Sequence, residues 1–160
     1  MLMLATILCA NFFFSCAESM ITVTFKQDGQ PTITKQVAVG ESLTDVPQPK
    51  SIEGYTITWN RTNFDSLKSS ITVTAVATPN VYTIRYNVGE GVILENEETF
   101  ATYKQEFTLE IPSLDGYTFV GWKLYGEDEF FQSGVYTWAE DIELNAVWSV
   151  DNNSEYTYFY

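Results

Sequence analysis

The chain contains no histidine, and its only two cysteines, Cys9 and Cys16, lie within the first 16 of its 160 residues. Histidine is the commonest general base and a common metal ligand, so its absence excludes Ser-His-Asp, Cys-His and HExxH sites. The lack of cysteine after Cys16 excludes thiol catalysis, cysteine zinc clusters and disulfides from the rest of the chain. The stability of that part must therefore come from burial and strand pairing.

Basic residues are also scarce. Lys and Arg number 8 against 21 Asp and Glu, which gives a formal net charge of −13. Phosphate backbones and anionic membrane surfaces repel so acidic a chain, because it has few cations with which to displace their counterions. We therefore expect no nucleic acid among its partners. The simplest role for the acidity is solubility in an extracellular medium.

The longest apolar run covers residues 2–14, LMLATILCANFFF. It has the length of a signal-peptide core and is short for a membrane span. Small Ser15, then Cys16 and polar sequence follow, in an order that resembles a bacterial lipoprotein signal. In such signals the cysteine becomes the lipidated N-terminus, so Cys16 is the predicted lipidation site. Cys9 fits less well, because the bulky Leu8 precedes it.

Two features depart from that pattern. Phe13 stands where leucine is usual, and no basic residue precedes Lys26. A plain signal cleaved near Ala17 or Ser19 and an ordinary buried strand are the alternatives. We expect export, with membrane contact only through a lipid anchor at Cys16.

Three segments recur in the same order along the rest of the chain. The first copy reads ITVTF at 21–25, GYTITW at 54–59 and ITVTAVA at 71–77; the second reads YTIRY at 82–86, GYTFVGW at 116–122 and IELNAVW at 142–148. Side chains that alternate with a period of two predict half-buried strands. The residues at 78–80, Thr-Pro-Asn, have turn chemistry and predict the boundary between the copies.

The second copy resembles the Listeria–Bacteroides repeat in YTIRYNVGEG, GYTFVGW and IELNAVW, and the first resembles the InlB B-repeat in ITVTFKQDGQ, GYTITW and ITVTAVATPN. These resemblances imply a bacterial surface protein. They also imply small β-grasp-like domains, each a mixed sheet with a short helical segment across one face. The sequence accommodates one or two helical turns at residues 40–46, ended by Pro47.

We therefore predict a mostly β (α+β) fold with two tandem small β-grasp-like repeat domains after an N-terminal signal segment. The predicted parts are a signal peptide or lipoprotein signal at 1–19, an InlB B-repeat-like domain at 20–80, a Listeria–Bacteroides repeat domain at 81–150 and a C-terminal tail or edge strand at 151–160. The tail ends in Tyr-Thr-Tyr-Phe-Tyr. This segment predicts an edge strand of the second domain, an exposed strand for β-augmentation by another chain, or the end of a fragment.

Trp59 and Trp122 occupy the same position in the two copies. Small domains without disulfides need large aromatic side chains in their cores, so we expect both to be buried. Stacking platforms for sugars or other ligands are the alternative. Trp138 lies in a segment that the first copy lacks, and is the better candidate for an exposed aromatic.

Carboxylates are the remaining source of chemistry, because two acids suffice for some hydrolases. Three clusters occur where turns are expected: Glu95, Glu97 and Glu98; Glu127, Asp128 and Glu129; Glu140, Asp141 and Glu143. Polar neighbours favour solvated loops over a pKa-tuning cleft. Calcium on these loops is an alternative, although the EF-hand order is absent. We predict no catalytic, cofactor-binding or metal residue, and the glycine pair at 89–91 lacks the third glycine and helix of a dinucleotide site.

Together these features predict a non-catalytic bacterial protein, either anchored at the cell surface or extracellular. Its predicted role is binding or adhesion to an unknown extracellular protein or glycan. The alternative is a structural spacer of the cell surface without a ligand of its own.

Overall fold

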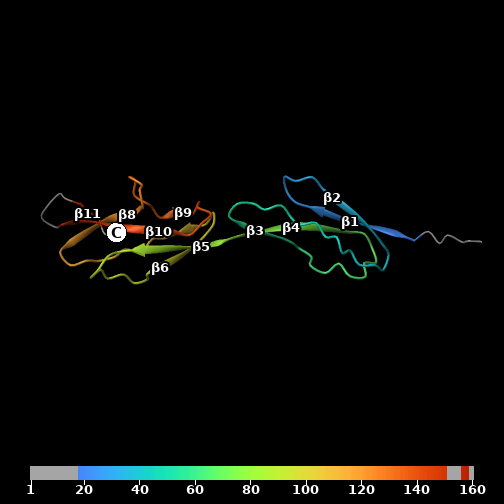
Figure 1. The fold of residues 1–160 in the computed structure, drawn as a ribbon, viewed down its shortest axis with the longest axis horizontal. Coiled ribbons are helices and arrows are strands. Elements are labelled where there is room, and N and C mark those ends of the chain that lie inside the picture. Colours follow the sequence, from blue (N-terminus) through green and yellow to red (C-terminus); the bar gives the residue numbers. More distant parts are fainter. Residues whose placement is uncertain (1–17, 151–155, 159–160) are drawn as a thin grey trace, which may run out of the picture. The chain divides into compact units, whose positions relative to one another are not determined.

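The computed structural model describes residues 18–150 and the backbone of residues 156–158. These residues form strands, turns and irregular segments, with no helix among them (Figure 1). The mostly β part of the prediction is confirmed. The strands are β1 (Met20–Lys26), β2 (Ile33–Ala38), β3 (Tyr55–Trp59), β4 (Ile71–Pro79), β5 (Val81–Asn87), β6 (Glu98–Thr102), β7 (Glu106–Phe107), β8 (Tyr117–Leu124), β9 (Gly134–Val135), β10 (Ile142–Val150) and β11 (Tyr156–Tyr158).

The described residues divide into two compact units. The first holds residues up to 48 together with 60–74, and the second holds 49–59 and the residues from 75 onward. Strand β4 thus contributes to both units. The domain bounds predicted from the sequence, 20–80 and 81–150, follow the two copies of the repeat and differ from this division. These bounds stay predictions.

Strand β1 is central in the first unit. It pairs antiparallel with β2 and parallel with the first half of β4, where Phe25 lies opposite Val73. Alternation with a period of two brings Val23 and Phe25 to the same buried face. Val23 and Val73 are fully buried, and the ring of Phe25 lies 5.7 Å from that of Phe64. Apolar contacts between β1, β4 and the loop that carries Phe64 therefore form the core of this unit.

The helical turns predicted at residues 40–46 are wrong, because this segment is irregular. Its backbone forms hydrogen bonds with the loop that carries Phe64 and Leu67. The N–H of Leu43 donates to the carbonyl oxygen of Phe64 (3.0 Å), and the N–H of Leu67 donates to that of Glu41 (2.9 Å). A helix over this segment would need the carbonyl of Glu41 for its own hydrogen bond. The grasp-like description of the repeats therefore stays a prediction.

Strand β10 is central in the second unit. It lies parallel to β5, with Ile142 opposite Ile84, and antiparallel to β8 and β11. Strand β6 continues the sheet beyond β5, and β7 pairs with β9 in a separate two-stranded ladder. In Figure 1 the green β5 and the red-orange β10 run side by side. The backbone of residues 156–158 pairs with residues 147–149 of β10, and the three alternatives for the tail stay predictions.

Both copies of the repeat use the same pairing pattern. The first has the strand order β2-β1-β4-β3, and the second has the equivalent path β6-β5-β10-β8. In each path the two central strands are parallel to each other, and each outer strand is antiparallel to the central strand beside it. Strand β4 pairs with two strands along its length: residues 71–74 pair with β1, and residues 75–79 pair with β3. The shared pattern supports the repeat found in the sequence.

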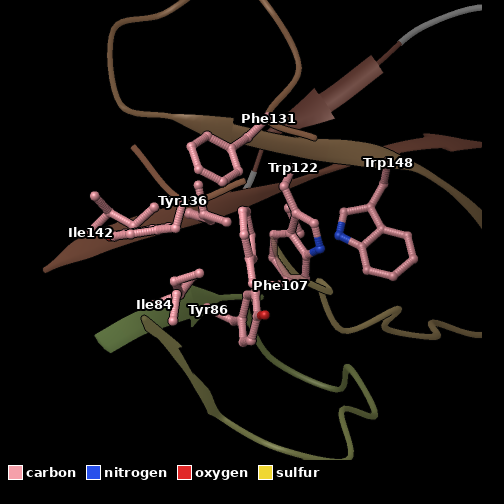
Figure 2. Close-up of a cluster of buried hydrophobic side chains, with 11 residues drawn as sticks. Ile84, Tyr86, Phe107, Trp122, Phe131, Tyr136, Ile142 and Trp148 are labelled. Carbon is pink, nitrogen blue, oxygen red and sulfur yellow. The ribbon is translucent and has the colours of Figure 1, made fainter. Parts of the chain in front are cut away.

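The core of the second unit is aromatic. Trp148 and Tyr136 are fully buried, and Trp122 is 2% exposed. Figure 2 shows these three side chains in one cluster with Phe131, contributed by β8, β10 and the segment between them. The prediction that Trp122 belongs to the core is confirmed. Its counterpart in the first copy, Trp59, is only half-buried.

The turn predicted at residues 78–80 is wrong. Strand β4 continues to Pro79, and β5 begins one residue after Asn80. The N–H of Asn80 donates to the carbonyl oxygen of Gly54, and its own carbonyl accepts from the N–H of Tyr103, both at 2.9 Å. These bonds to distant backbone groups hold Asn80 between β4 and β5, so the segment stays extended instead of reversing.

Residues 1–17 lie outside the described part of the chain, and Cys16 and the signal segment lie there with them. Their predictions stay untested by the structure. Among the described residues, no helix is long and apolar enough to cross a membrane.

Candidate functional site

The second copy has the longer connection between its GYTxxW-like segment and its closing strand. This connection spans residues 123–141, against 60–70 in the first copy. It surrounds a hollow of about 440 Å³, here called the aromatic hollow. That volume lies within the range of small-ligand sites. The residues that line the hollow include Glu127, Glu129, Phe130, Phe131, Thr137 and Trp138.

Phe131 and Trp138 give the hollow an aromatic wall that is fixed to the core. The N–H of Phe131 donates to the carbonyl oxygen of Trp122 at 2.8 Å, which bridges the loop to β8. The ring centroids of Phe131 and Trp138 lie 4.6 Å apart, and Trp138 also lies 5.7 Å from Tyr136. Trp138 is therefore half-buried, and it is less exposed than the sequence indicated.

Phe130 is the more exposed aromatic of the hollow, with 39% of its surface accessible. Its ring covers Gly121 of β8 so closely that a Cβ there would lie 2.6 Å from the ring. The Nζ of Lys123 lies 5.0 Å from the centroid of the same ring, within cation–π distance. The Phe130 ring thus already contacts a cation from its own chain.

The far side of the connection is fixed by hydrogen bonds. β9 pairs with β7, and the Oγ of Ser133 accepts from the N–H of Leu109 at 3.0 Å. The hydroxyl of Tyr136 donates to the carbonyl oxygen of Glu140 at 2.8 Å. The pKa of Tyr136 is raised to about 12, first by burial and then by the negative charges of Asp141 and Glu140. These contacts hold the walls of the hollow in place without a helix.

Negative charge dominates the rim of the hollow. Glu127 and Glu129 are exposed, and the described lining residues include no lysine or arginine. Gln132 and Thr137 add neutral polar groups. The lining therefore combines aromatic surface with hydrogen-bond acceptors of negative charge. It suits a ligand that carries donors or a positive charge.

A larger hollow of about 990 Å³ lies along β5 and the loop that follows it. Its lining includes Arg85, whose Nε lies 3.9 Å from a carboxylate oxygen of Glu98. Its one aromatic residue, Tyr86, is buried in the core. This hollow offers a ligand less aromatic contact than the aromatic hollow does.

The three acidic clusters are solvent-exposed, as expected, but Glu98 lies in β6 and Glu143 in β10 instead of in turns. Glu95, Glu97, Glu98, Glu127, Asp128, Glu129, Glu140, Asp141 and Glu143 are all exposed. Asp141 accepts a hydrogen bond from the N–H of Thr83 at 2.8 Å, so it holds the start of the sheet. Within the part of the chain that the structure describes, no three acidic, histidine or cysteine residues are grouped to hold a metal ion.

Sequence reasoning singled out Trp138 but not its two phenylalanine neighbours in the hollow. The pair Phe130-Phe131 lies in the segment by which the second copy exceeds the first. The extra length of this segment was the only feature of the sequence that pointed to these two residues. The bridge from Phe131 to Trp122 joins residues that no sequence motif links, so the hollow itself had no local signature.

Comparison with known families gives one match. Residues 82–147 match the sequence profile of the Listeria-Bacteroides repeat domain. No curated protein matches the chain. The aromatic hollow and the core around Trp122 lie inside the matched segment. The resemblance of the first copy to the InlB B-repeat stays a prediction. The resemblance inferred from the second copy's motifs is confirmed by this match over residues 82–147.

Proposed function

We propose that this chain is a non-catalytic bacterial protein, exported to the cell surface or beyond, that binds an extracellular protein or glycan through its second repeat. Listeria-Bacteroides repeat domains typically occur in surface or extracellular proteins and are not known for catalysis. The family therefore supports the location and the absence of catalysis. The binding role needs a feature of this chain.

The aromatic hollow is the observation that carries the binding role. A domain that serves only as a spacer needs no loop beyond the shortest connection between its strands. The second repeat instead has a longer connection, and that connection exposes Phe130 beside two acidic residues. Exposed aromatic residues in a concave site are typical of binding surfaces.

Arrays of glycans and of extracellular proteins, probed with residues 20–160, test this function. We expect saturable binding to at least one member, and Phe130→Ala should weaken it. Val81→Ala is a matched control, because Val81 is exposed and does not line the hollow. If both variants bind the ligand as tightly as the wild type, the binding site lies outside the aromatic hollow. No binding to any member of the arrays would favour the alternative role of a structural spacer.

A further inference from the structure

We propose that the aromatic hollow binds a basic segment of a partner protein, with an arginine or lysine side chain placed between its aromatic wall and its acidic rim. This inference rests on the proposed function and names the chemical class of its ligand. It follows from the charge of the rim, from the aromatic rings and from the poor fit of an acidic glycan.

The charge of the rim selects for cations. Glu127 and Glu129 line the hollow, and no lysine or arginine is among its described lining residues. The chain as a whole carries a formal net charge of −13, so its field attracts basic partners and repels acidic ones. A guanidinium or ammonium group in the hollow would find charged hydrogen-bond acceptors on the rim.

The rings of the hollow suit the same group. The ammonium of Lys123 lies 5.0 Å from the ring centroid of Phe130, so a cation of the partner would bind beside Lys123 or in its place. Phe131 and Trp138 provide further aromatic surface. Arginine has a planar head that stacks on aromatic rings and donates to carboxylates, and its apolar stem can cover Val135, which is 49% exposed.

An acidic glycan fits less well. The carboxylates of the rim would repel sulfated or sialylated glycans. The lining therefore favours a basic protein segment over an acidic glycan.

Labelled hexa-arginine, with hexa-glutamate as its counterpart, tests the inference by fluorescence anisotropy against the full chain. We expect saturable, salt-sensitive binding of hexa-arginine and none of hexa-glutamate. Glu127→Gln combined with Glu129→Gln should weaken binding about fivefold or more. Glu90→Gln combined with Glu95→Gln removes the same charge from exposed residues outside the hollow, and should change binding less than about twofold. Circular dichroism checks that each variant is folded.

Equal weakening by the two double variants would overturn the inference, because it would show attraction to the overall charge alone. Failure of hexa-arginine to saturate the wild type would overturn it as well. In that case a neutral ligand from the arrays that is lost in Phe130→Ala would leave the proposed function standing. If neither hexa-arginine nor any array member binds, both the inference and the proposed function are overturned.

Discussion

The indole Nε1 of Trp122 donates a hydrogen bond to the backbone carbonyl of Glu110 over 2.8 Å. Trp148 is equally buried in the same cluster, yet its Nε1 has no hydrogen-bond partner among the described residues. Two neighbouring indoles of one core thus differ in a single polar contact. The difference provides a matched pair of substitutions.

We expect Trp122→Phe to lower the free energy of unfolding more than Trp148→Phe does. Both changes remove the same volume, but only the first leaves the carbonyl of Glu110 unpaired, at a cost of about 1–3 kcal/mol. Urea unfolding measures the difference. Trp122→Ala should cost about 3–5 kcal/mol, because it leaves a cavity in the core. A near-wild-type melting temperature for Trp122→Ala would place this side chain at the surface and restore the stacking role.

Gly54→Ala should destabilise the chain more than Gly116→Ala. Both glycines precede the Tyr-Thr of their repeat and have φ of +77°, so both alanines bear strain of roughly 1–2 kcal/mol. A Cβ at Gly54 would also lie 2.3 Å from the Tyr103 ring, whereas Gly116 has nothing within 4 Å. The additional overpacking should cost about 1–3 kcal/mol in urea unfolding. Combination with Tyr103→Ala should close most of the gap, and a gap that persists would count against this contact.

The stability of the second unit should fall as pH rises from about 10 to about 12. The pKa of Tyr136 is about 12 in the folded chain and 10.0 for a free tyrosine. Between these values the unfolded chain loses the proton while the folded chain keeps it, so deprotonation favours unfolding by up to about 1.4 kcal/mol per pH unit. Below pH 10 this stabilisation is fully present. Tyr136→Phe should show a shallower fall than the wild type, and parallel curves would refute the assignment.

Residues 81–150 should unfold cooperatively when expressed alone, because their aromatic core closes within the segment. Thermal unfolding followed by near-ultraviolet circular dichroism measures this. The matched fragment 49–160 adds the β3–β4 hairpin that belongs to the same compact unit. A molten 81–150 beside a cooperative 49–160 would move the boundary of the domain to residue 49.

Cys16→Ser should abolish incorporation of labelled fatty acid and release the protein from the membrane fraction, whereas Cys9→Ser should change neither. The basis is the order of an apolar run, Ser15, Cys16 and polar sequence. Lipid transfer in such signals uses the cysteine thiol, which serine cannot replace. The lipid anchor is excluded if the wild type takes up no label and Cys16→Ser stays with the membrane. A secreted protein would then be the better interpretation.

The sequence predicted the strands that the repeats share, because alternation over five or more residues is a local signal. It did not predict β7 and β9, whose two-residue ladder depends on partners far along the chain. The helical turns at 40–46 and the turn at 78–80 failed for one reason. In both segments, hydrogen bonds to distant backbone groups, such as that from Asn80 to Gly54, override the local preference.

The candidate site was predictable only in part. The extra length of the second repeat marked the segment, and Trp138 marked its place. The exposure of Phe130 and the burial of Phe131 depend on how the loop returns to β8 through the bridge at Trp122. Two adjacent phenylalanines have the same local chemistry, so no sequence pattern distinguishes their environments.

The parallel pairing of β5 with β10 determines how the second repeat bears tension. The chain enters at the start of β5 and leaves at the end of β10, and residues 84–87 lie beside residues 142–145. A pull between these two points slides the strands along each other, so the hydrogen bonds of the ladder share the load and must break together. Strands peeled from one end would instead lose these bonds one at a time. We expect a repeat with this arrangement to resist extension more than one whose strands peel apart.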